Sequence, residues 1–380
     1  MIKRLLSLIL LLILTNTLAF SKELRNDYEP RDTITTKKIV AYYEGGELSR
    51  YTKVFKALIK SLSDHGWVEP MDLKRFKTSK ELWAYLSTDA KSNYLEFRKD
   101  LFYSSDWDST KRSVNIRKIQ ERIKTKDDID MVLAFGTWAG QDLSHNNIDK
   151  NTFVIDASDP VDANIVKSAQ SSGYAYLHAL VDEQKYTKQI SLFYNIFHFK
   201  KMGLVYQDTH SGKSYAGLDD AKKMSKKYDF KLSTCVVKPN KNLAKEKQSF
   251  IKCYKNLTRI SDAIYVGITP SCTINDFQYF MPTINKNRIP TFSKDGSLEV
   301  KYGVLMGISN NNFKYIAEFH AKAIINTLNG ELIKDQTIFF ETPTLLSLNL
   351  KTAQNIDWDP PINIIGITKE LYYDNMLTKY

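Results

Sequence analysis

One short stretch of the chain combines side chains that could hold a small anion. The run "DMVLAFGTWAGQDLS", residues 130–144, reads as an apolar strand that stops at Gly136 and turns directly into a helix. Thr137 stands at the helix start, where its hydroxyl and the free backbone N–H groups suit a carboxylate or another anion. The ring of Trp138 offers a stacking surface if it faces a cleft and a core contact if it does not. The corner is therefore either a binding site or an ordinary turn.

Small, hydroxyl and acidic residues also follow several other apolar strands. The segments are "EGGELSRY" (44–51), "GTWAGQ" (136–141), "SDPVDAN" (158–164), "QDTHSGKSY" (207–215), "GITPSCT" (267–273) and "SKDGS" (293–297). Open α/β sheets bind their ligands beyond the carboxyl ends of the strands, which is where these segments fall. Glu44 is a candidate because Gly45 and Gly46 let the backbone approach a guest. Asp159 precedes Pro160, so it either contacts a ligand or caps a helix that starts there.

The chain lacks the motifs of common catalytic and metal sites. "HSGKS" (210–214) follows a strand, but a phosphate-binding loop needs a glycine where this chain has Gln207. Neither an HExxH zinc motif nor a GxSxG nucleophile elbow occurs, and the six histidines are scattered. We therefore predict no catalytic residue, no metal and no cofactor, and a protein that binds small molecules rather than an enzyme.

The basic composition does not indicate a nucleic-acid partner. Lys and Arg number 54 against 43 Asp and Glu, which gives a net charge of +11. These side chains are spread along the whole sequence and form no dense basic stripe, so we predict no binding to nucleic acid.

Residues 1–19 have the pattern of a secretory signal peptide. A short basic region, "MIKR", precedes the apolar run "LLSLILLLIL" (5–14), and the small residues Thr17 and Ala19 precede a plausible cleavage site. The apolar run is too short to span a bilayer comfortably, although an uncleaved N-terminal anchor is the alternative. We expect a periplasmic protein whose residues 20–37 form a disordered leader.

The three cysteines allow one disulfide in an oxidising compartment. Cys235 lies in a strand-like run and Cys253 on the following helix, so a bridge between them would close a loop of roughly twenty residues. We favour this bridge over two buried free thiols, and it leaves Cys272 unpaired. Their spacing fits no metal motif.

Continuous apolar strands alternate with amphipathic helices along the rest of the chain. The expected strands are "KIVAYY" (38–43), "MVLAF" (131–135), "TFVID" (152–156), "MGLVY" (202–206), "AIYVG" (263–267) and "GVLMGI" (303–308). Helices are expected over 183–199, 214–228, 243–260 and 313–328. This alternation predicts an α/β fold with parallel sheets, and 380 residues suit two doubly wound lobes better than one large sheet. The aromatic-rich segment 91–112 is predicted to be an insertion on the first lobe.

Several stretches, in their order and spacing, resemble the type I periplasmic solute-binding proteins. Within that group the chain is similar to the substrate-binding proteins of ABC importers, whose relatives include tryptophan and tyrosine binders. The resemblance covers residues 38–372. The stretches that carry it are "YYEGGELSRY", "AFGTWAGQDLS", "SDPVDANIVKS", "VYQDTHSGKSYAG", "DAIYV", "PTFSKDGSLEVKYGVLMGIS" and "FHAKAIINTLNGE".

The resemblance implies two Rossmann-like lobes that enclose a ligand and are joined by three hinge crossovers. Lobe 1 would comprise residues 38–175 completed by 296–332, and lobe 2 residues 176–295 completed by 333–380. Thr137 is similar to the Thr or Ser that the family offers to a ligand carboxylate, and Asp159 matches an Asp-Pro pair that serves an amine or another donor. The other ligand-binding positions that it suggests are Glu44, Trp138, Gln207, Asp208, Ser214, Ser271 and Ser293. The Cys235/Cys253 pair is also similar to a feature of this branch.

The implied function is to capture a small organic ligand and deliver it to an ABC permease in the inner membrane. A sensor that presents the same closure to a histidine kinase or chemoreceptor is the first alternative, and a periplasmic hydrolase is the second. The ligand is expected to be aromatic or amino-acid-like. One departure argues against an amino acid, because "GITPSCT" lacks the acid or amide that many relatives carry after the equivalent of "AIYV".

Overall fold

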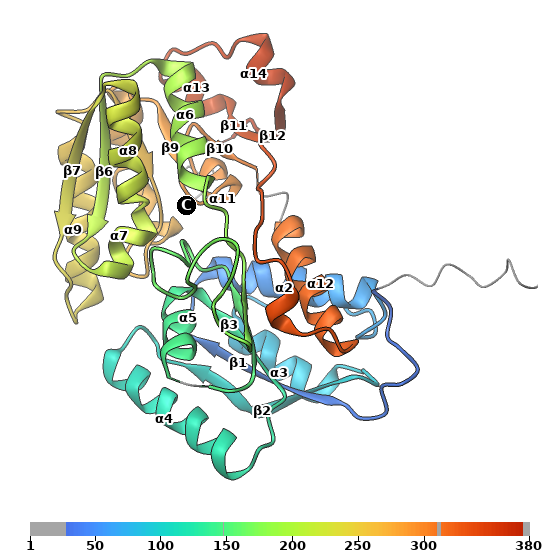
Figure 1. The fold of residues 1–380 in the computed structure, drawn as a ribbon. Helices are drawn as coiled ribbons and strands as arrows, with labels where there is room; N and C mark the ends of the chain where they lie inside the picture. The colour runs from blue at the N-terminus through green and yellow to red at the C-terminus, as the bar shows by residue number, and fades with distance from the viewer. Residues whose placement is uncertain (1–27, 147, 310–312, 375–380) are drawn as a thin grey trace, which may run out of the picture.

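The structure, a computed structural model, describes residues 28–146, 148–309 and 313–374, which form two α/β lobes (Figure 1). Lobe 1 is built on a five-stranded sheet and lobe 2 on a seven-stranded sheet. Strand pairing is parallel throughout, except for one antiparallel pair in lobe 2. The predicted α/β fold with two lobes is confirmed. Within those three ranges no helix has the length and apolar character needed to cross a membrane.

The sheet of lobe 1 has the strand order β2-β1-β3-β4-β5. Its strands are β1 (Lys38–Glu44), β2 (Leu95–Ser104), β3 (Met131–Phe135), β4 (Asn151–Ile155) and β5 (Leu177–Ala179). Its helices are α2 (Ser49–Asp64), α3 (Ser79–Asp89), α4 (Ser109–Thr125), α5 (Gly136–His145) and α12 (Lys314–Leu328). Every residue of the central strand β3 is buried, as expected of a parallel strand covered on both faces.

The sheet of lobe 2 has the strand order β12-β11-β10-β9-β8-β6-β7. Its strands are β6 (Lys201–Gln207), β7 (Lys231–Val237), β8 (Ala263–Val266), β9 (Thr291–Ser293), β10 (Met306–Ile308), β11 (Leu346–Asn349) and β12 (Thr368–Tyr372). Its helices are α6 (Lys185–Phe197), α7 (His210–Ala216), α8 (Leu218–Tyr228), α9 (Leu243–Leu257), α10 (Met281–Lys286), α11 (Ser297–Lys301), α13 (Leu350–Asn355) and α14 (Ile362–Gly366). The short 3₁₀ segments are η1 (Ile274–Tyr279) in lobe 2 and η3 (Ile333–Asp335), which contacts β5.

Three segments of the chain connect the lobes, so the predicted three-crossover hinge is confirmed. They follow β5, β10 and α12, because α12 packs against α2 of lobe 1 while β10 and β11 lie in the sheet of lobe 2. The first and third segments run side by side. Val181 donates its N–H to the carbonyl of Ile338 at 2.8 Å and accepts from the N–H of Phe340 at 2.9 Å.

The predicted lobe boundaries differ from the observed sheet membership in two places. β5 pairs with β4, so the sheet of lobe 1 continues past residue 175. β10 pairs with β9 and β11, so residues 306–308 belong to the sheet of lobe 2 although segment 296–332 was predicted to complete lobe 1. From that segment, α12 packs on lobe 1. We therefore propose domain limits after β5, after β10 and after α12.

The amino-terminal expectations lie partly outside the described residues. The signal peptide over 1–19 and the first part of the leader fall in residues 1–27. Residues 28–37 were predicted to be disordered, but they form turns that pack on lobe 1. The carbonyl of Tyr28 accepts a hydrogen bond from Trp67 Nε1 at 2.9 Å, and the carbonyl of Glu29 accepts one from Asn329 at 3.2 Å.

A disulfide joins Cys235 on β7 to Cys253 on α9, as predicted. The third cysteine, Cys272, is a buried free thiol. The bridge fastens the edge strand of the lobe 2 sheet to the helix that covers it, across a sequence separation of 18.

Replacing both bridged cysteines with serine is expected to lower the free energy of unfolding by about 3 kcal/mol, because the unfolded chain regains the entropy of a loop of this length. Chemical denaturation of the oxidised protein and of the double variant measures the difference. Cys272→Ala is the control, since it leaves the bridge in place. A double variant as stable as the oxidised parent would contradict the prediction.

Candidate ligand-binding site

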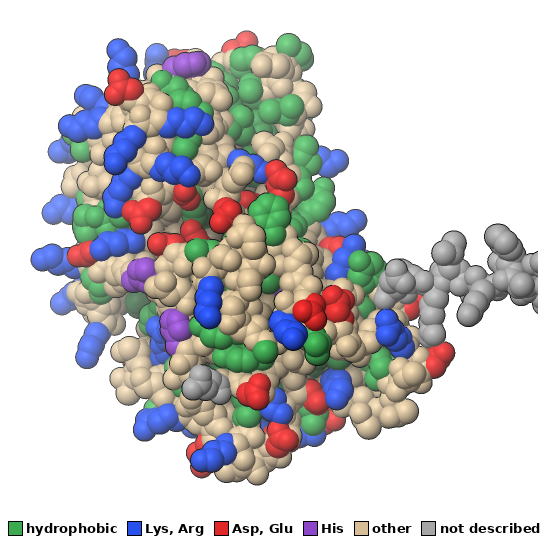
Figure 2. All heavy atoms as spheres, viewed as in Figure 1, with side chains coloured by type: hydrophobic (Ala, Val, Ile, Leu, Met, Phe, Trp, Pro, Cys, Tyr) green, Lys and Arg blue, Asp and Glu red, His purple; other side chains and the backbone are tan. Residues whose placement is uncertain are grey.

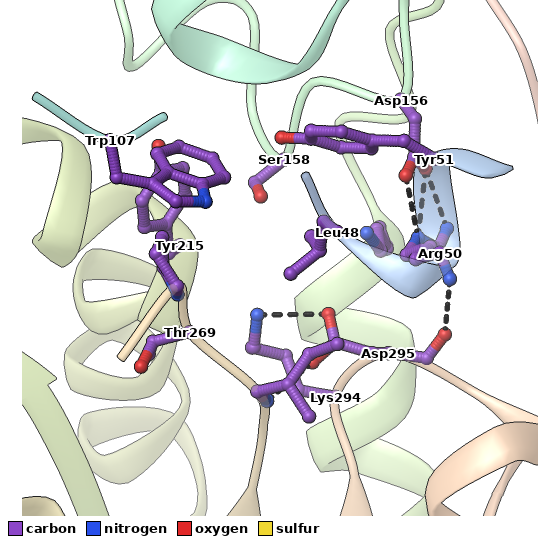
Figure 3. Close-up of a pocket in the computed structure, with 13 residues that line it drawn as sticks. Leu48, Arg50, Tyr51, Trp107, Asp156, Ser158, Tyr215, Thr269, Lys294 and Asp295 are labelled. Carbon is purple, nitrogen blue, oxygen red and sulfur yellow. Dashed lines mark hydrogen bonds and ion pairs between the residues drawn. The ribbon is translucent and has the colours of Figure 1, made fainter. Parts of the chain in front are cut away.

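A cavity lies between the lobes at the carboxyl ends of strands from both sheets (Figure 3). Lobe 1 lines it with Leu48, Arg50, Tyr51, Trp107, Asp156 and Ser158, and lobe 2 with Lys185, Tyr215, Ile268, Thr269, Pro270, Lys294 and Asp295. Its volume is about 40 Å³, and a neighbouring cavity of about 70 Å³ shares six of these residues. Because ligand pockets usually measure about 300–1,000 Å³, a larger guest requires the lobes to open.

One wall of the cavity is an ion pair between Arg50 at the start of α2 and Asp156 after β4. Arg50 Nε lies 2.9 and 2.8 Å from the two carboxylate oxygens, and Nη2 lies 2.7 Å from Oδ1. The side chains are 11% and 6% exposed. Arg50 Nη1 also donates to the backbone carbonyl of Asp295 in lobe 2 at 2.7 Å. The same guanidinium therefore neutralises Asp156 and ties the two lobes together.

The loop after β9 provides a second ion pair. Lys294 Nζ lies 2.9 Å from Asp295 Oδ1, and Asp295 Oδ2 accepts the backbone N–H of Ile268 at 2.9 Å. Burial by itself raises the pKa of Asp295, but the positive charges of Lys294, Arg50 and Lys185 outweigh it and hold this pKa below its usual range. The carboxylate is therefore ionised, and both its oxygens are engaged.

Lys185, the first residue of α6, is the third cation of the cavity. Its half-buried ammonium lies 5.0 Å from the ring centroid of Tyr186, and no described carboxylate or other acceptor gives it an ion pair or a hydrogen bond. Burial lowers its pKa to about 8, and the charge of Arg50 acts in the same direction. With Arg50 and Lys294 each facing a carboxylate, the lysine leaves one uncompensated positive charge at neutral pH.

Three aromatic side chains also line the cavity. Tyr51 and Trp107 have ring centroids 6.4 Å apart, and Tyr215 faces them from lobe 2 (Figure 3). The hydroxyl of Tyr215 is buried, and the side chain of Thr137 lies close to it without a well-formed hydrogen bond. A polar group on a ligand could therefore bond to this hydroxyl.

Further contacts between the lobes define a closed arrangement. Tyr186 Oη donates to the carbonyl of Ser158 at 3.4 Å, and Ser211 Oγ donates to Gln141 Oε1 at 3.4 Å. Both distances are longer than the usual range of about 2.5–3.0 Å for an O–H···O hydrogen bond, so these contacts hold the lobes weakly compared with the Arg50 contact.

The predicted ligand-binding residues of lobe 1 lie around the cavity but do not line it. Glu44 is 1% exposed and accepts hydrogen bonds from Tyr42 at 2.7 Å and Ser104 at 2.9 Å, and burial raises its pKa to about 7. Thr137 is buried and accepts a bond from the N–H of Ser158 at 3.4 Å. Trp138 and Asp159 also lie outside the cavity lining.

Local contacts explain those last two positions. The ring of Trp138 is covered by the guanidinium of Arg112, 4.6 Å from the ring centroid. Asp159 accepts hydrogen bonds from the backbone N–H groups of Val161 and Asp162 at 3.1 and 3.0 Å. These bonds correspond to the capping role, which was one of the two roles expected for this residue. Both side chains therefore already have partners in the closed structure.

The predicted residues of lobe 2 also have protein partners. Gln207 accepts from Thr209 at 3.1 Å, and Asp208 pairs with Lys213 at 3.1 Å. Ser214 is buried at the lobe interface, where its hydroxyl lies 3.5 Å from the carbonyl of Asp159. The two remaining serines, Ser271 and Ser293, are buried and donate to Glu246 and Glu299 respectively, so neither lines the cavity.

None of the thirteen residues that line the cavity is among the predicted ligand-binding residues, although six of them lie one or two positions from a predicted one. Ser158, Tyr215 and Asp295 lie one or two positions from Asp159, Ser214 and Ser293. Arg50 belongs to the quoted "EGGELSRY" segment, where a charged side chain among small residues after a strand could have been proposed as a ligand contact. The sequence around Lys185 contains no feature of this kind.

A larger groove of about 800 Å³ lies between α2 and α11, away from the strand ends. It is open, and lysines of both lobes line it together with apolar side chains. We favour the smaller cavity as the site because the strand-end loops of both sheets converge on it. In the described ranges no group of three or more His, Cys, Asp and Glu residues could hold a metal ion.

Two hinged α/β lobes with a polar cavity between their strand ends define a protein of the type I periplasmic binding fold. The family described as ABC transporter substrate binding protein matches residues 94–365, and the chain belongs to this family. No curated protein matches the chain significantly.

Solved structures of the same fold agree with this assignment. An ABC domain from Streptococcus pneumonia in complex with L-Trp has a TM-score of 0.67 at 17% identity, over 88% of this chain and 100% of that one. A conserved domain protein from Vibrio cholerae has a TM-score of 0.65 at 16% identity, over 88% and 100%. A substrate-binding protein with adhesive properties from Clostridium difficile, in a ligand-free, open structure, has a TM-score of 0.58 at 17% identity, over 89% and 100%.

Proposed function

We propose that this substrate-binding protein captures a small organic solute between its lobes and delivers it to the permease of an ABC importer. The observation that carries the proposal is a cavity whose walls come from both lobes, so that a bound solute contacts both and favours the closed state. The protein would act in the periplasm after removal of residues 1–19, and it would bind without chemical turnover.

The surface charge is consistent with a solute rather than nucleic acid as the partner. On the face shown in Figure 2, Lys and Arg side chains are spread over both lobes with acidic side chains between them. No basic stripe of the kind that follows a phosphate backbone stands out on this face.

A solute that occupies the cavity is expected to stabilise the protein by about 2.7 kcal/mol at a hundredfold excess over its Kd. Native mass spectrometry of protein isolated from its own periplasm identifies the solute, and thermal unfolding with that compound measures the shift. Trp107→Ala is expected to cut the shift by at least half, because it removes one aromatic wall of the cavity. Tyr279→Ala, which truncates an exposed ring of lobe 2, is expected to leave it unchanged. If no metabolite mixture shifts the parent protein, the proposed function is wrong.

A further inference from the structure

The carboxylates around the two cavities are already occupied by protein donors. Asp156 faces Arg50 through both oxygens, and Asp295 accepts from Lys294 and Ile268. Asp182, which lines the second cavity, accepts the backbone N–H groups of Gln184 at 3.3 Å and Thr342 at 3.1 Å. A ligand ammonium would therefore have to compete with existing bonds for any of these oxygens.

The cations around the cavities are not occupied in the same way. Lys185 lines both cavities, and no described residue gives its ammonium a hydrogen bond or an ion pair. Its position makes this costly, because Arg50 and Lys294 are nearby and because a positive charge at the start of a helix opposes the helix dipole. A half-buried cation in such a place favours an anionic partner.

The available donors suit a carboxylate better than a phosphate. The forked guanidinium of Arg50 is committed to Asp156 and to the carbonyl of Asp295, which leaves one ammonium as the free charged donor. The lining also includes aromatic and apolar side chains, such as Tyr51, Trp107 and Ile268, which can contact the body of an organic acid.

Resting on the proposed function of this cavity, we propose that the captured solute is a small carboxylic acid that carries no ammonium group. Its carboxylate binds Lys185 and its aromatic or apolar body lies against Tyr51 and Trp107. This assignment departs from an amino-acid ligand because the site offers an ammonium without a hydrogen-bond acceptor, whereas each of its carboxylates already accepts bonds from protein donors.

Matched probes separate these ligand classes. The acids 3-phenylpropionate, indole-3-propionate and isovalerate are compared by calorimetry with L-phenylalanine, L-tryptophan and L-leucine and with the corresponding amines. We expect an acid to bind at least about tenfold more tightly than its amino acid and its amine, the effect of one charge-assisted hydrogen bond. An amino acid or amine that binds as tightly as its acid overturns the proposal.

If none of the probes binds, the solute that native mass spectrometry identifies in the purified protein tests the proposal instead. A co-purified acid without an amine supports the proposal, and a co-purified amine or amino acid overturns it. A protein that carries and accepts no solute overturns the proposed function itself, which is a different result.

Two lysines of α6 give a matched pair of variants. Lys185→Met is expected to weaken binding of the acid at least about tenfold. Lys188→Met is expected to leave it unchanged, because Lys188 lies one turn further along, pairs with Glu341 and lines neither cavity. The thermal stability of Lys185→Met without ligand should equal or exceed that of the parent, since the variant removes a half-buried ammonium that has no carboxylate partner. Equal loss of binding in both variants overturns the role of Lys185.

A pH series gives an independent measurement. The charged groups that line the two cavities with Lys185 are Arg50, Asp156, Asp182, Lys294 and Asp295, and the pKa of the lysine itself is lowered to about 8. The ammonium is present below this pH and is lost above it, so the affinity for the acid should fall about tenfold between pH 7 and pH 9. Lys185→Met should show a flat profile over that range. A parent profile that is also flat contradicts the assignment.

Discussion

Replacing Arg50 with methionine is expected to lower the free energy of unfolding by about 3–5 kcal/mol, because Asp156 is left as a buried carboxylate without its partner. Both side chains are about nine-tenths buried in the closed structure, so the carboxylate loses its partner in a place that is shielded from water unless the lobes open. The variant also loses the bond from Nη1 to the carbonyl of Asp295, which spans the lobes. Urea unfolding measures the stability, and solution scattering should show a more open average shape.

The double variant Arg50→Met, Asp156→Asn is the matched control. Removing the orphaned charge as well should recover at least about 1 kcal/mol of the loss, since the largest penalty comes from burying one charge alone. The bond to Asp295 stays broken in both variants, so the open shape should persist. A double variant no more stable than the single one would show that the pairing with Asp156 is not the source of the effect.

The sheets were predictable where strands are continuously apolar. "MVLAF" and "TFVID" correspond to β3 and β4, which helices cover on both faces. β2 was missed and read as an insertion because it is an edge strand. Its sequence "LEFRKDLFYS" carries charges in the middle, where the side chains of residues 99 and 100 are exposed to water. The alternation that would have revealed this strand is interrupted there.

Several predicted ligand-binding residues lie one or two positions from residues that line the cavity, and their contact with a ligand stays a prediction. Polar residues at strand ends are attractive candidates, yet the same groups satisfy backbone N–H groups in the turns that follow. The hydroxyl of Ser293 accepts bonds from the N–H groups of Asp295 at 3.2 Å and Gly296 at 2.8 Å, and Asp159 caps its own turn. Residues next to these turn-forming side chains, such as Asp295, are the ones that line the cavity.

The charges of the cavity depend on contacts that one sequence does not reveal. Arg50 and Asp156 are 106 positions apart, and Arg50 reaches Asp295 across 245 positions. Lys185 is distinguished by its place in the lining of both cavities without a carboxylate partner. No local sequence pattern identifies such a residue, because the groups around it come from distant parts of the chain and are known only from the structure.

Gly136, at the corner between β3 and α5, is the position where an added methyl group is expected to be most damaging. Its φ of +84° lies in the left-handed region, and a Cβ there would lie 1.8 Å from the hydroxyl of Tyr51. Gly136→Ala should therefore cost about 1–3 kcal/mol in backbone strain and a further 1–3 kcal/mol or so from overpacking. Because Tyr51 lines the cavity and must move, solute binding should weaken as well.

Gly330, at the end of α12, separates these two contributions. Its φ is +99°, but a Cβ there meets no atom within 4 Å, so Gly330→Ala carries the backbone strain without the contact. Thermal and urea unfolding of both variants should show the larger loss for Gly136→Ala, with weakened solute binding in that variant alone. Equal losses of stability in the two variants would mean that Tyr51 moves aside at little cost. The close approach of Tyr51 to the β3–α5 corner would then not hold this wall of the cavity in place.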